Sequence, residues 1–152
     1  MKLFKDLLVW FLAGFGLIAI LTYVFTDHVE ELTARYNVIT LSGSTFDLDV
    51  KVLITDDIDF AVKYVKENLD STVKSEDFDA RAVTFGTIDG KSPIIWLPHE
   101  TTVDVINHEL LHATVSIMNW AGVPLTDSTE EVYAYELQYL SNQFYKQIKP
   151  TK

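Results

Sequence analysis

One short segment combines residue types that could do chemistry together: His108-Glu109-Leu110-Leu111-His112. On a helix, residues four apart lie on the same face, so the two imidazoles can reach one metal ion. Neutral imidazole nitrogens bind zinc at roughly 2.0–2.1 Å. Zinc lowers the pKa of a bound water, and Glu109 can accept the proton of that water during attack on a carbonyl. The sequence therefore predicts one Zn²⁺, with His108 and His112 as ligands and Glu109 as general base.

A hydrolytic zinc site needs a third protein ligand, and a chain without cysteine must supply histidine or carboxylate. The extended metzincin pattern would place glycine and histidine where this chain has Val115 and Met118. Further along, Glu130 and Glu131 lie side by side, and successive helical residues point about 100° apart, so only one can face the ion. The predicted helix has an apolar stripe formed by Tyr133, Leu137, Leu140 and Phe144, and Glu130 lies on the N-terminal extension of that stripe. Glu131 lies on a more polar face, which suits a site open to water. Glu131 also fits a capping box with Ser128.

The segment Thr129-Glu130-Glu131-Val132-Tyr133-Ala134-Tyr135 adds a second basis for this choice. It resembles the second helix of gluzincin metallopeptidases, whose ligand glutamate lies in an E-x-x-A-D pattern. The resemblance implies that Glu131 is the third zinc ligand and that Ala134 lets this helix lie close to the HExxH helix. Tyr135 stands where the family has an aspartate that orients a ligand histidine. A phenol there could accept from an imidazole N–H or stabilise an oxyanion, so Tyr135 is a candidate catalytic residue.

The stretch from about residue 46 to 144 is also similar to small phage-encoded proteins of zincin type. The resemblance implies a minimal zincin fold and zinc-dependent hydrolysis of a peptide or amide bond in a peptide or protein substrate. Two other functions stay open: a structural or virion-associated phage protein that keeps the metal without turnover, and a hydrolase of cell-wall amides. We expect His28 and His99 to be surface histidines and Tyr133 and Tyr139 to be core aromatics.

Periodicity and turn signals predict the elements that must position these residues. In chain order they are a strand at 46–53, a helix at 58–69, strands at 81–88 and 92–97, a helix at about 102–120 and a helix at about 128–147. Asp89-Gly90 is a strong hairpin signal between the second and third strands, and Gly122 ends the HExxH helix. The predicted N-caps of the three helices are, in chain order, Asp56 or Asp57, Thr101 or Thr102, and Asp127 or Ser128. This order predicts an α+β domain with a short, mostly antiparallel sheet behind an N-terminal hydrophobic helix.

The N-terminal segment predicts a membrane anchor. From Leu7 to Phe25 no side chain is charged, and nineteen helical residues span roughly 28 Å, close to the thickness of a bilayer's hydrocarbon core. Lys2 and Lys5 precede this run, so the N-terminus should stay cytoplasmic and the C-terminal domain should lie outside. No small-x-small cleavage site follows the run, which favours a signal anchor over a signal peptide. The alternative is a helix buried in a packed assembly, such as a virus particle.

The predicted organisation is a hydrophobic anchor at 1–26, a juxtamembrane linker at 27–45 and a metal-binding domain at 46–152. Without Lys2, Lys5 and Asp6, the 12 basic and 22 acidic side chains fall to 10 and 21, a net charge of −11 beyond the anchor. Phosphate binding needs clustered Lys and Arg, so this balance argues against nucleic acid as a partner.

We predict that the full-length chain, expressed in a bacterium, fractionates with the inner membrane, because its charge-free run is long enough to cross a bilayer. Protease should reach the C-terminal domain only from the outer side, since the lysines hold the N-terminus in the cytoplasm. Soluble protein that is shielded from external protease in the cytoplasm would contradict the anchor.

Overall fold

The structure is a computed structural model that describes residues 37–43 and 46–148. The predicted anchor at 1–26 lies outside the described residues, and so does His28. Within the described ranges, no helix has the length and apolar character needed to span a membrane. All described residues belong to one unit of the chain, Tyr36–Lys152.

Four strands form a single sheet in the order β1-β2-β4-β3. The strands are β1 (Asn37–Leu41), β2 (Val50–Ile54), β3 (Val83–Phe85) and β4 (Ile94–Leu97). β1 pairs antiparallel with β2, and β3 pairs antiparallel with β4, whereas β2 and β4 run parallel. The predicted α+β class is confirmed, and the sheet is mixed.

The parallel pair arises because a long crossover separates β2 from β4. Parallel strands cannot be joined by a tight turn and need a connection that crosses a face of the sheet, usually with a helix. Here that connection holds helix α2 (Ile58–Asn68), the short 3₁₀ helix η1 (Ser75–Phe78) and β3 itself. The hairpin of β3 and β4 therefore places β4 beside β2 and leaves β3 at the edge of the sheet.

Strand β1 lies within the segment for which the sequence predicts a linker. Ile39 and Leu41 are buried, whereas Val38 and Thr40 are exposed. This alternation is typical of a strand with one covered face. The polar residues ahead of it mask this short pattern in the sequence. Conversely, the strand predicted from Phe46 begins only at Val50.

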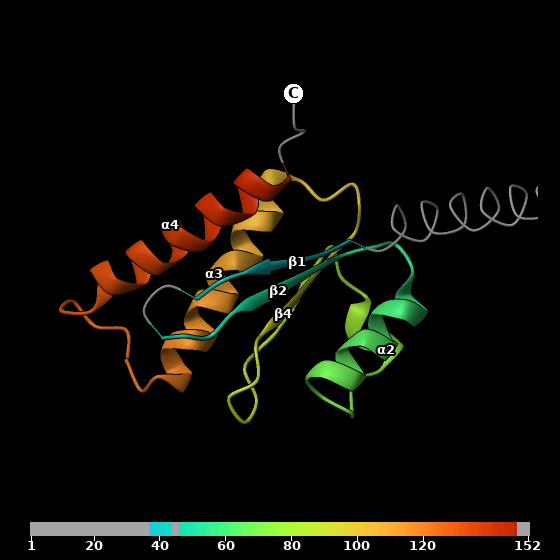
Figure 1. Ribbon diagram of the computed structural model, residues 1–152, viewed down its shortest axis with the longest axis horizontal. Helices are drawn as coiled ribbons and strands as arrows, with labels where there is room; N and C mark the ends of the chain where they lie inside the picture. The colour runs from blue at the N-terminus through green and yellow to red at the C-terminus, as the bar shows by residue number, and fades with distance from the viewer. Residues whose placement is uncertain (1–36, 44–45, 149–152) are drawn as a thin grey trace, which may run out of the picture. The chain divides into compact units, whose positions relative to one another are not determined.

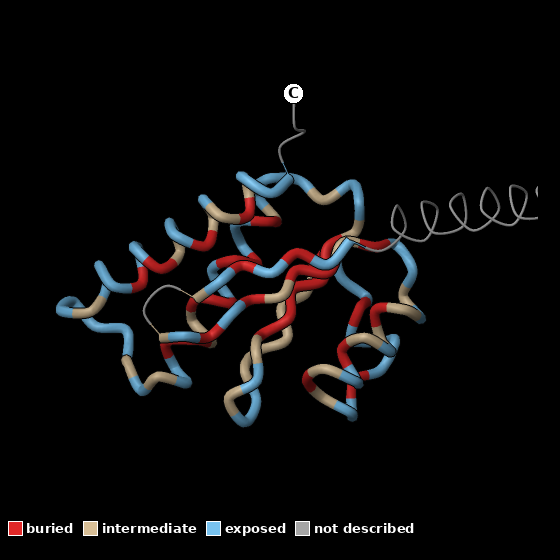
Figure 2. Tube along the Cα trace, in the orientation of Figure 1, coloured by how far each residue is buried: buried red, intermediate tan, exposed pale blue. Residues whose placement is uncertain are grey.

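Two cores flank the sheet, one on each face (Figures 1 and 2). Helices α3 (Val103–Trp120) and α4 (Glu130–Gln147) cover one face and α2 covers the other. Alternate residues of the central strands supply the two cores, as the period of two requires. The α3 side takes Val50, Val52, Ile95 and Leu97, and the α2 side takes Leu53, Ile94 and Trp96.

The local signals at the turn and at the first helix are confirmed. Asp89 and Gly90 both have positive φ, 50° and 73°, as the two central residues of a type I′ hairpin turn require. Lys91 N donates to Ile88 O across this turn at 2.9 Å. Asp57 caps α2, where its carboxylate accepts from Phe60 N at 2.9 Å.

The start of α4 differs from the prediction. Its N-cap is Thr129, not Asp127 or Ser128. The capping box predicted for Ser128 and Glu131 requires Ser128 as the N-cap, so it does not form at this helix end. The last residue, Gln147, agrees with the predicted end. Helix α3 begins after Thr102 and ends at Trp120, as predicted.

Adjacent leucines of the HExxH segment allow a matched test of how α3 is seated. Leu110 is 1% exposed in the core, whereas Leu111 is 44% exposed. We predict that Leu110→Ala lowers the free energy of unfolding by about 2–5 kcal/mol, because it leaves a cavity against the sheet. Leu111→Ala should lower it by less than about 1 kcal/mol. Denaturant titration of both variants measures this difference, and equal losses would mean that α3 is rotated from the position described.

Candidate functional site

Helix α3 presents His108 and His112 together on its exposed face. Their Nε2 atoms lie 3.0 Å apart, and the rings meet edge to face with centroids 4.6 Å apart and planes at 82°. One turn of helix separates the two residues, so the backbone brings the imidazoles together without help from another element. In the geometry described, one Nε2 can donate to the other, depending on the tautomers.

The separation of the two nitrogens fits a shared zinc ion. Two ligands at roughly 2.0–2.1 Å from a tetrahedral ion lie about 3.3 Å apart, close to the 3.0 Å between the Nε2 atoms of His108 and His112. Binding would require both Nε2 lone pairs to face the metal, which places the proton of each neutral ring on Nδ1. The pair therefore suits two of the ligands of such a site.

The side chain of Glu109 contacts the edge strand β3. It is 6% exposed, and Thr84 Oγ1 lies 2.7 Å from its Oε2 and 3.0 Å from its backbone oxygen. The single proton of the hydroxyl can serve either acceptor, and the carboxylate is the stronger one. No pattern along the chain indicates this contact, because it joins a strand residue to a helix residue 25 positions away.

An open cavity of about 370 Å³ joins these groups. It is lined by Ala82, Val83, Thr84, Gly86, His108, Glu109 and His112. One wall is the edge strand and the other is the exposed flank of α3. Glu109, His108 and His112 therefore border one open space.

The structure does not bring Glu131 or Tyr135 to this cavity. Neither residue is among those that line it, Glu131 is exposed in the first turn of α4, and Tyr135 is 67% exposed. Across residues 37–43 and 46–148, no set of three histidine or acidic side chains could hold a metal ion. Of the predicted site residues, the described geometry thus gathers His108, His112 and Glu109.

The buried face of α4 does not include Glu131. Tyr133, Leu140 and Phe144 are buried, which confirms the apolar stripe, and the acid Glu136 is buried with them. Tyr133 is a core aromatic as expected, and its hydroxyl donates to Val123 O at 2.7 Å, but Tyr139 is 42% exposed.

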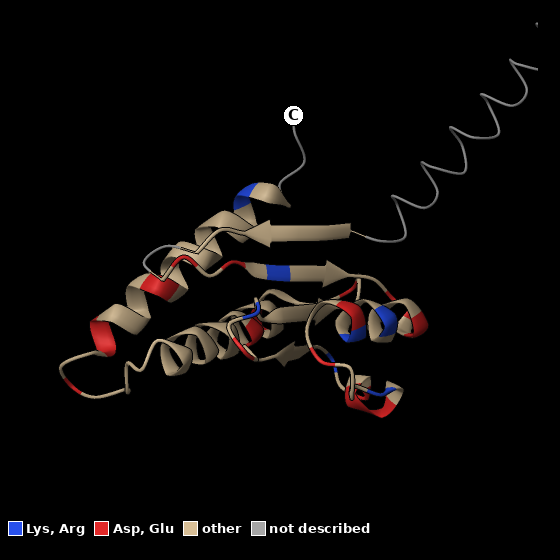
Figure 3. Cartoon of the chain, turned by 60° about the horizontal axis from the view of Figure 1, so that its bottom comes forward, with Lys and Arg blue, Asp and Glu red and all other residues tan. Residues whose placement is uncertain are grey.

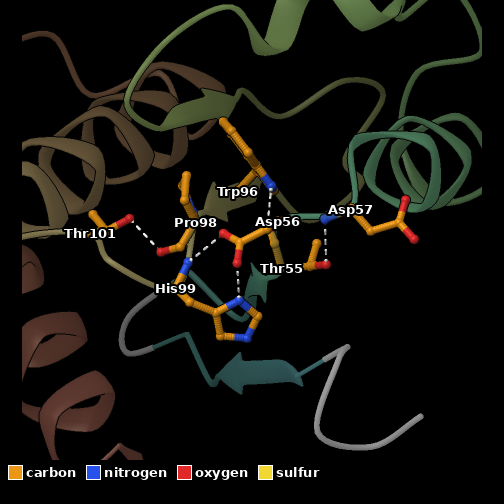
Figure 4. Close-up of polar contacts among 7 residues, drawn as sticks. All are labelled: Thr55, Asp56, Asp57, Trp96, Pro98, His99 and Thr101. Atoms are coloured by element: carbon orange, nitrogen blue, oxygen red, sulfur yellow. Dashed lines mark hydrogen bonds and ion pairs between the residues drawn. The ribbon is translucent and has the colours of Figure 1, made fainter. Parts of the chain in front are cut away.

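His99 links two loops and does not line the cavity. Its Nδ1 is 2.9 Å from Asp56 Oδ2, and its backbone N donates to Asp56 Oδ1 at 3.0 Å (Figure 4). Hydrogen bonding from the backbone and side chain of His99 holds the pKa of Asp56 below its ordinary value. Because Asp56 follows β2 and His99 follows β4, this pair links the loops at the carboxyl ends of the two parallel strands.

Comparisons of the chain with models of protein families, with curated proteins and with solved structures find no match.

The contact between Thr84 and Glu109 generates a testable prediction. Thr84→Val removes the donor and leaves a buried carboxylate oxygen without it, so the free energy of unfolding should fall by about 1–3 kcal/mol. Thr84→Ser keeps the hydroxyl and should cost less than Thr84→Val. Denaturant titration at neutral pH gives both values. No loss in Thr84→Val would contradict a stabilising role for this hydrogen bond, because valine keeps the methyl group of threonine and lacks only the hydroxyl.

Proposed function

We propose that the chain is a zinc-dependent hydrolase of the metallopeptidase type that cleaves peptide or amide bonds. The observation that carries this proposal is the 3.0 Å separation of His108 Nε2 and His112 Nε2 beside a cavity that Glu109 also lines. A zinc ion at this pair would supply a water molecule of lowered pKa and an electrophile for the carbonyl oxygen. The minimal zincin fold is part of the same proposal.

The chain's own residues then divide the remaining work. Glu109 is the general base, because it lines the same cavity as the two histidines. Thr84 fixes the direction of that carboxylate through the 2.7 Å contact with Oε2. A base held in one rotamer loses little conformational freedom when the substrate binds, which favours proton transfer over a fixed path.

Glu131 is the proposed third ligand, and Tyr135 is a proposed helper one turn further along α4. The support for Glu131 is its E-x-x-A spacing and its place on a helix that packs against α3. Its carboxylate makes no hydrogen bond or ion pair with another described residue, so it can reorient without breaking one. Reaching the histidines requires movement of this side chain or of the first turn of α4, since no third ligand stands beside them within 46–148.

The sheet offers a peptide substrate one edge beside the cavity. The β1 edge is covered by α4, since Gln143 bonds both N and O of Ser42 and Gln147 Nε2 donates to Thr40 O. At the other edge, β3 pairs only with β4 and lines the cavity. An extended substrate can add to such an edge through main-chain hydrogen bonds. We propose that the substrate lies along β3.

The place of action follows from the N-terminal sequence. We propose that a membrane anchor at 1–26 holds the domain on the outer side of a bacterial membrane, where a phage-encoded hydrolase could meet proteins or cell-wall amides. A metal-stabilised virion protein is the alternative without turnover, and the variants below separate it from an enzyme.

We predict that purified full-length protein binds one equivalent of Zn²⁺ and that His108→Ala or His112→Ala abolishes this binding, because each removes one of two converging ligands. Glu109→Gln should keep the metal and lose hydrolysis of a peptide and peptidoglycan panel, because it removes a base and not a ligand. Elemental analysis and the cleavage panel give the two readouts. Zinc without cleavage in wild type would favour the structural alternative, and equal zinc in wild type and His112→Ala would end the metal proposal.

The adjacent glutamates provide the matched control for the third ligand. Glu131→Ala should weaken zinc binding strongly, while Glu130→Ala should change it little, although both variants remove one charge from the same helical turn. The reverse order would place the ligand on the apolar stripe and contradict the assignment of Glu131.

A further inference from the structure

The candidate site continues beyond the histidines as a groove between the start of β3 and the N-terminal half of α3. The cavity of about 370 Å³ shares Ala82, His108 and Glu109 with a second cavity of about 310 Å³. That second cavity shares Arg81 and Val105 with a third one of about 280 Å³, which the loop at 98–102 borders. Because neighbours share lining residues, the three spaces lie next to one another, and together they are called the groove below.

Arg81 stands out among the residues that line this groove. It is the only lysine or arginine in the three linings and the only arginine in the described part of the chain. The other basic residues shown in Figure 3 lie elsewhere, for example on α2 and β2. The side chain is exposed, and its guanidinium makes no ion pair or hydrogen bond with another described residue. An exposed guanidinium that is left unpaired in a strongly acidic chain is available to a ligand.

Two acidic residues besides Glu109 line cavities together with Arg81, and neither forms an ion pair with it. Hydrogen bonding from the Thr102 side chain, followed by backbone N–H groups at the start of α3, lowers the pKa of Asp104, and the charge of Arg81 is the last contribution. Asp104 is therefore engaged with its own helix end. Glu100 lines only the outermost cavity, so it does not stand between Arg81 and His108.

We propose that Arg81 is a specificity-determining residue that binds a carboxylate of the substrate next to His108 and Glu109. This inference rests on the proposed hydrolase function and names its substrate class. The planar guanidinium offers parallel N–H donors that match the two oxygens of a carboxylate. Arg81, His108 and Glu109 line the same cavity of about 310 Å³, a volume at the small end of ligand pockets. A bond cleaved at Glu109 would thus lie close to the carboxylate held by Arg81.

The carboxylate can come from a peptide's free C-terminus or from an aspartate or glutamate side chain. In the first case the enzyme trims residues from chain ends, and in the second it cuts beside acidic residues. Both sources present the same two oxygens to Arg81. Small probes that carry the carboxylate either at the C-terminus or on the side chain can separate them.

The test uses the full-length chain in detergent micelles at pH 8 with EDTA, so that no metal contributes to binding. N-acetylalanine, N-acetylalaninamide and an N-acetylaspartyl amide are titrated, and the backbone amides of Ala82 and Thr84 are followed by NMR. We expect at least one carboxylate probe to bind about tenfold more tightly than the neutral amide. Arg81→Gln should remove this preference and Arg81→Lys should keep part of it. Lys66→Gln, which removes the same charge from an exposed position on α2, should leave it unchanged.

Equal affinity of all three probes for wild type, or a preference that survives in Arg81→Gln with an otherwise unchanged spectrum, would overturn the proposal. Preference for N-acetylalanine assigns a C-terminal carboxylate, and preference for the aspartyl probe assigns an acidic side chain. Zinc measurements on the histidine variants are separate from these titrations. Zinc binding with no probe preference contradicts only the role of Arg81, whereas probe preference without zinc contradicts only the hydrolase.

Discussion

The seating of α3 on the sheet is the constraint on which the candidate site depends. Ile106, Leu110, Ala113 and Ile117 are buried against the strands, and they form a stripe at helical spacing. Leu110 lies two residues after His108, a rotation of about 200°, so burying the leucine turns the histidine outward. Glu109 is rotated by about 100° from both, which directs it sideways to β3. The orientation of α3 on the sheet thus exposes the two imidazoles to solvent and directs the carboxylate to the strand.

The edges of the sheet are treated differently, and this asymmetry gives the site its surroundings. An edge strand presents unpaired backbone groups that can recruit another chain. At β1 the side-chain amides of Gln143 and Gln147 occupy backbone groups of Ser42 and Thr40. At β3 the edge forms a wall of the cavity beside the histidines. The proposed position of a substrate along β3 depends on this difference between the two edges.

Charge adds a second asymmetry. The chain has a formal net charge of −10, and such a field disfavours acidic ligands over most of the surface. Arg81 is the exception in the groove, where one of the acids that line the same cavity, Asp104, is hydrogen-bonded at its own helix end. A single cation in an acidic setting acts at short range, because solvent and salt screen it over about 10 Å. Recognition by Arg81 would therefore depend on direct contact and not on steering.

The sequence by itself determined the features that depend on neighbours along the chain. The limits of α3, the Asp89-Gly90 turn, the Asp57 cap and the buried stripe of α4 follow from local rules, and so does the meeting of His108 with His112 one turn later. The tertiary structure decided what depends on distant partners. It paired β2 with β4 in parallel, added β1, and set Thr84 against Glu109 and Arg81 beside His108. It also left Glu131 outside the lining of the cavity at His108 and His112, because no spacing rule along one helix can reveal which neighbour its buried face will meet.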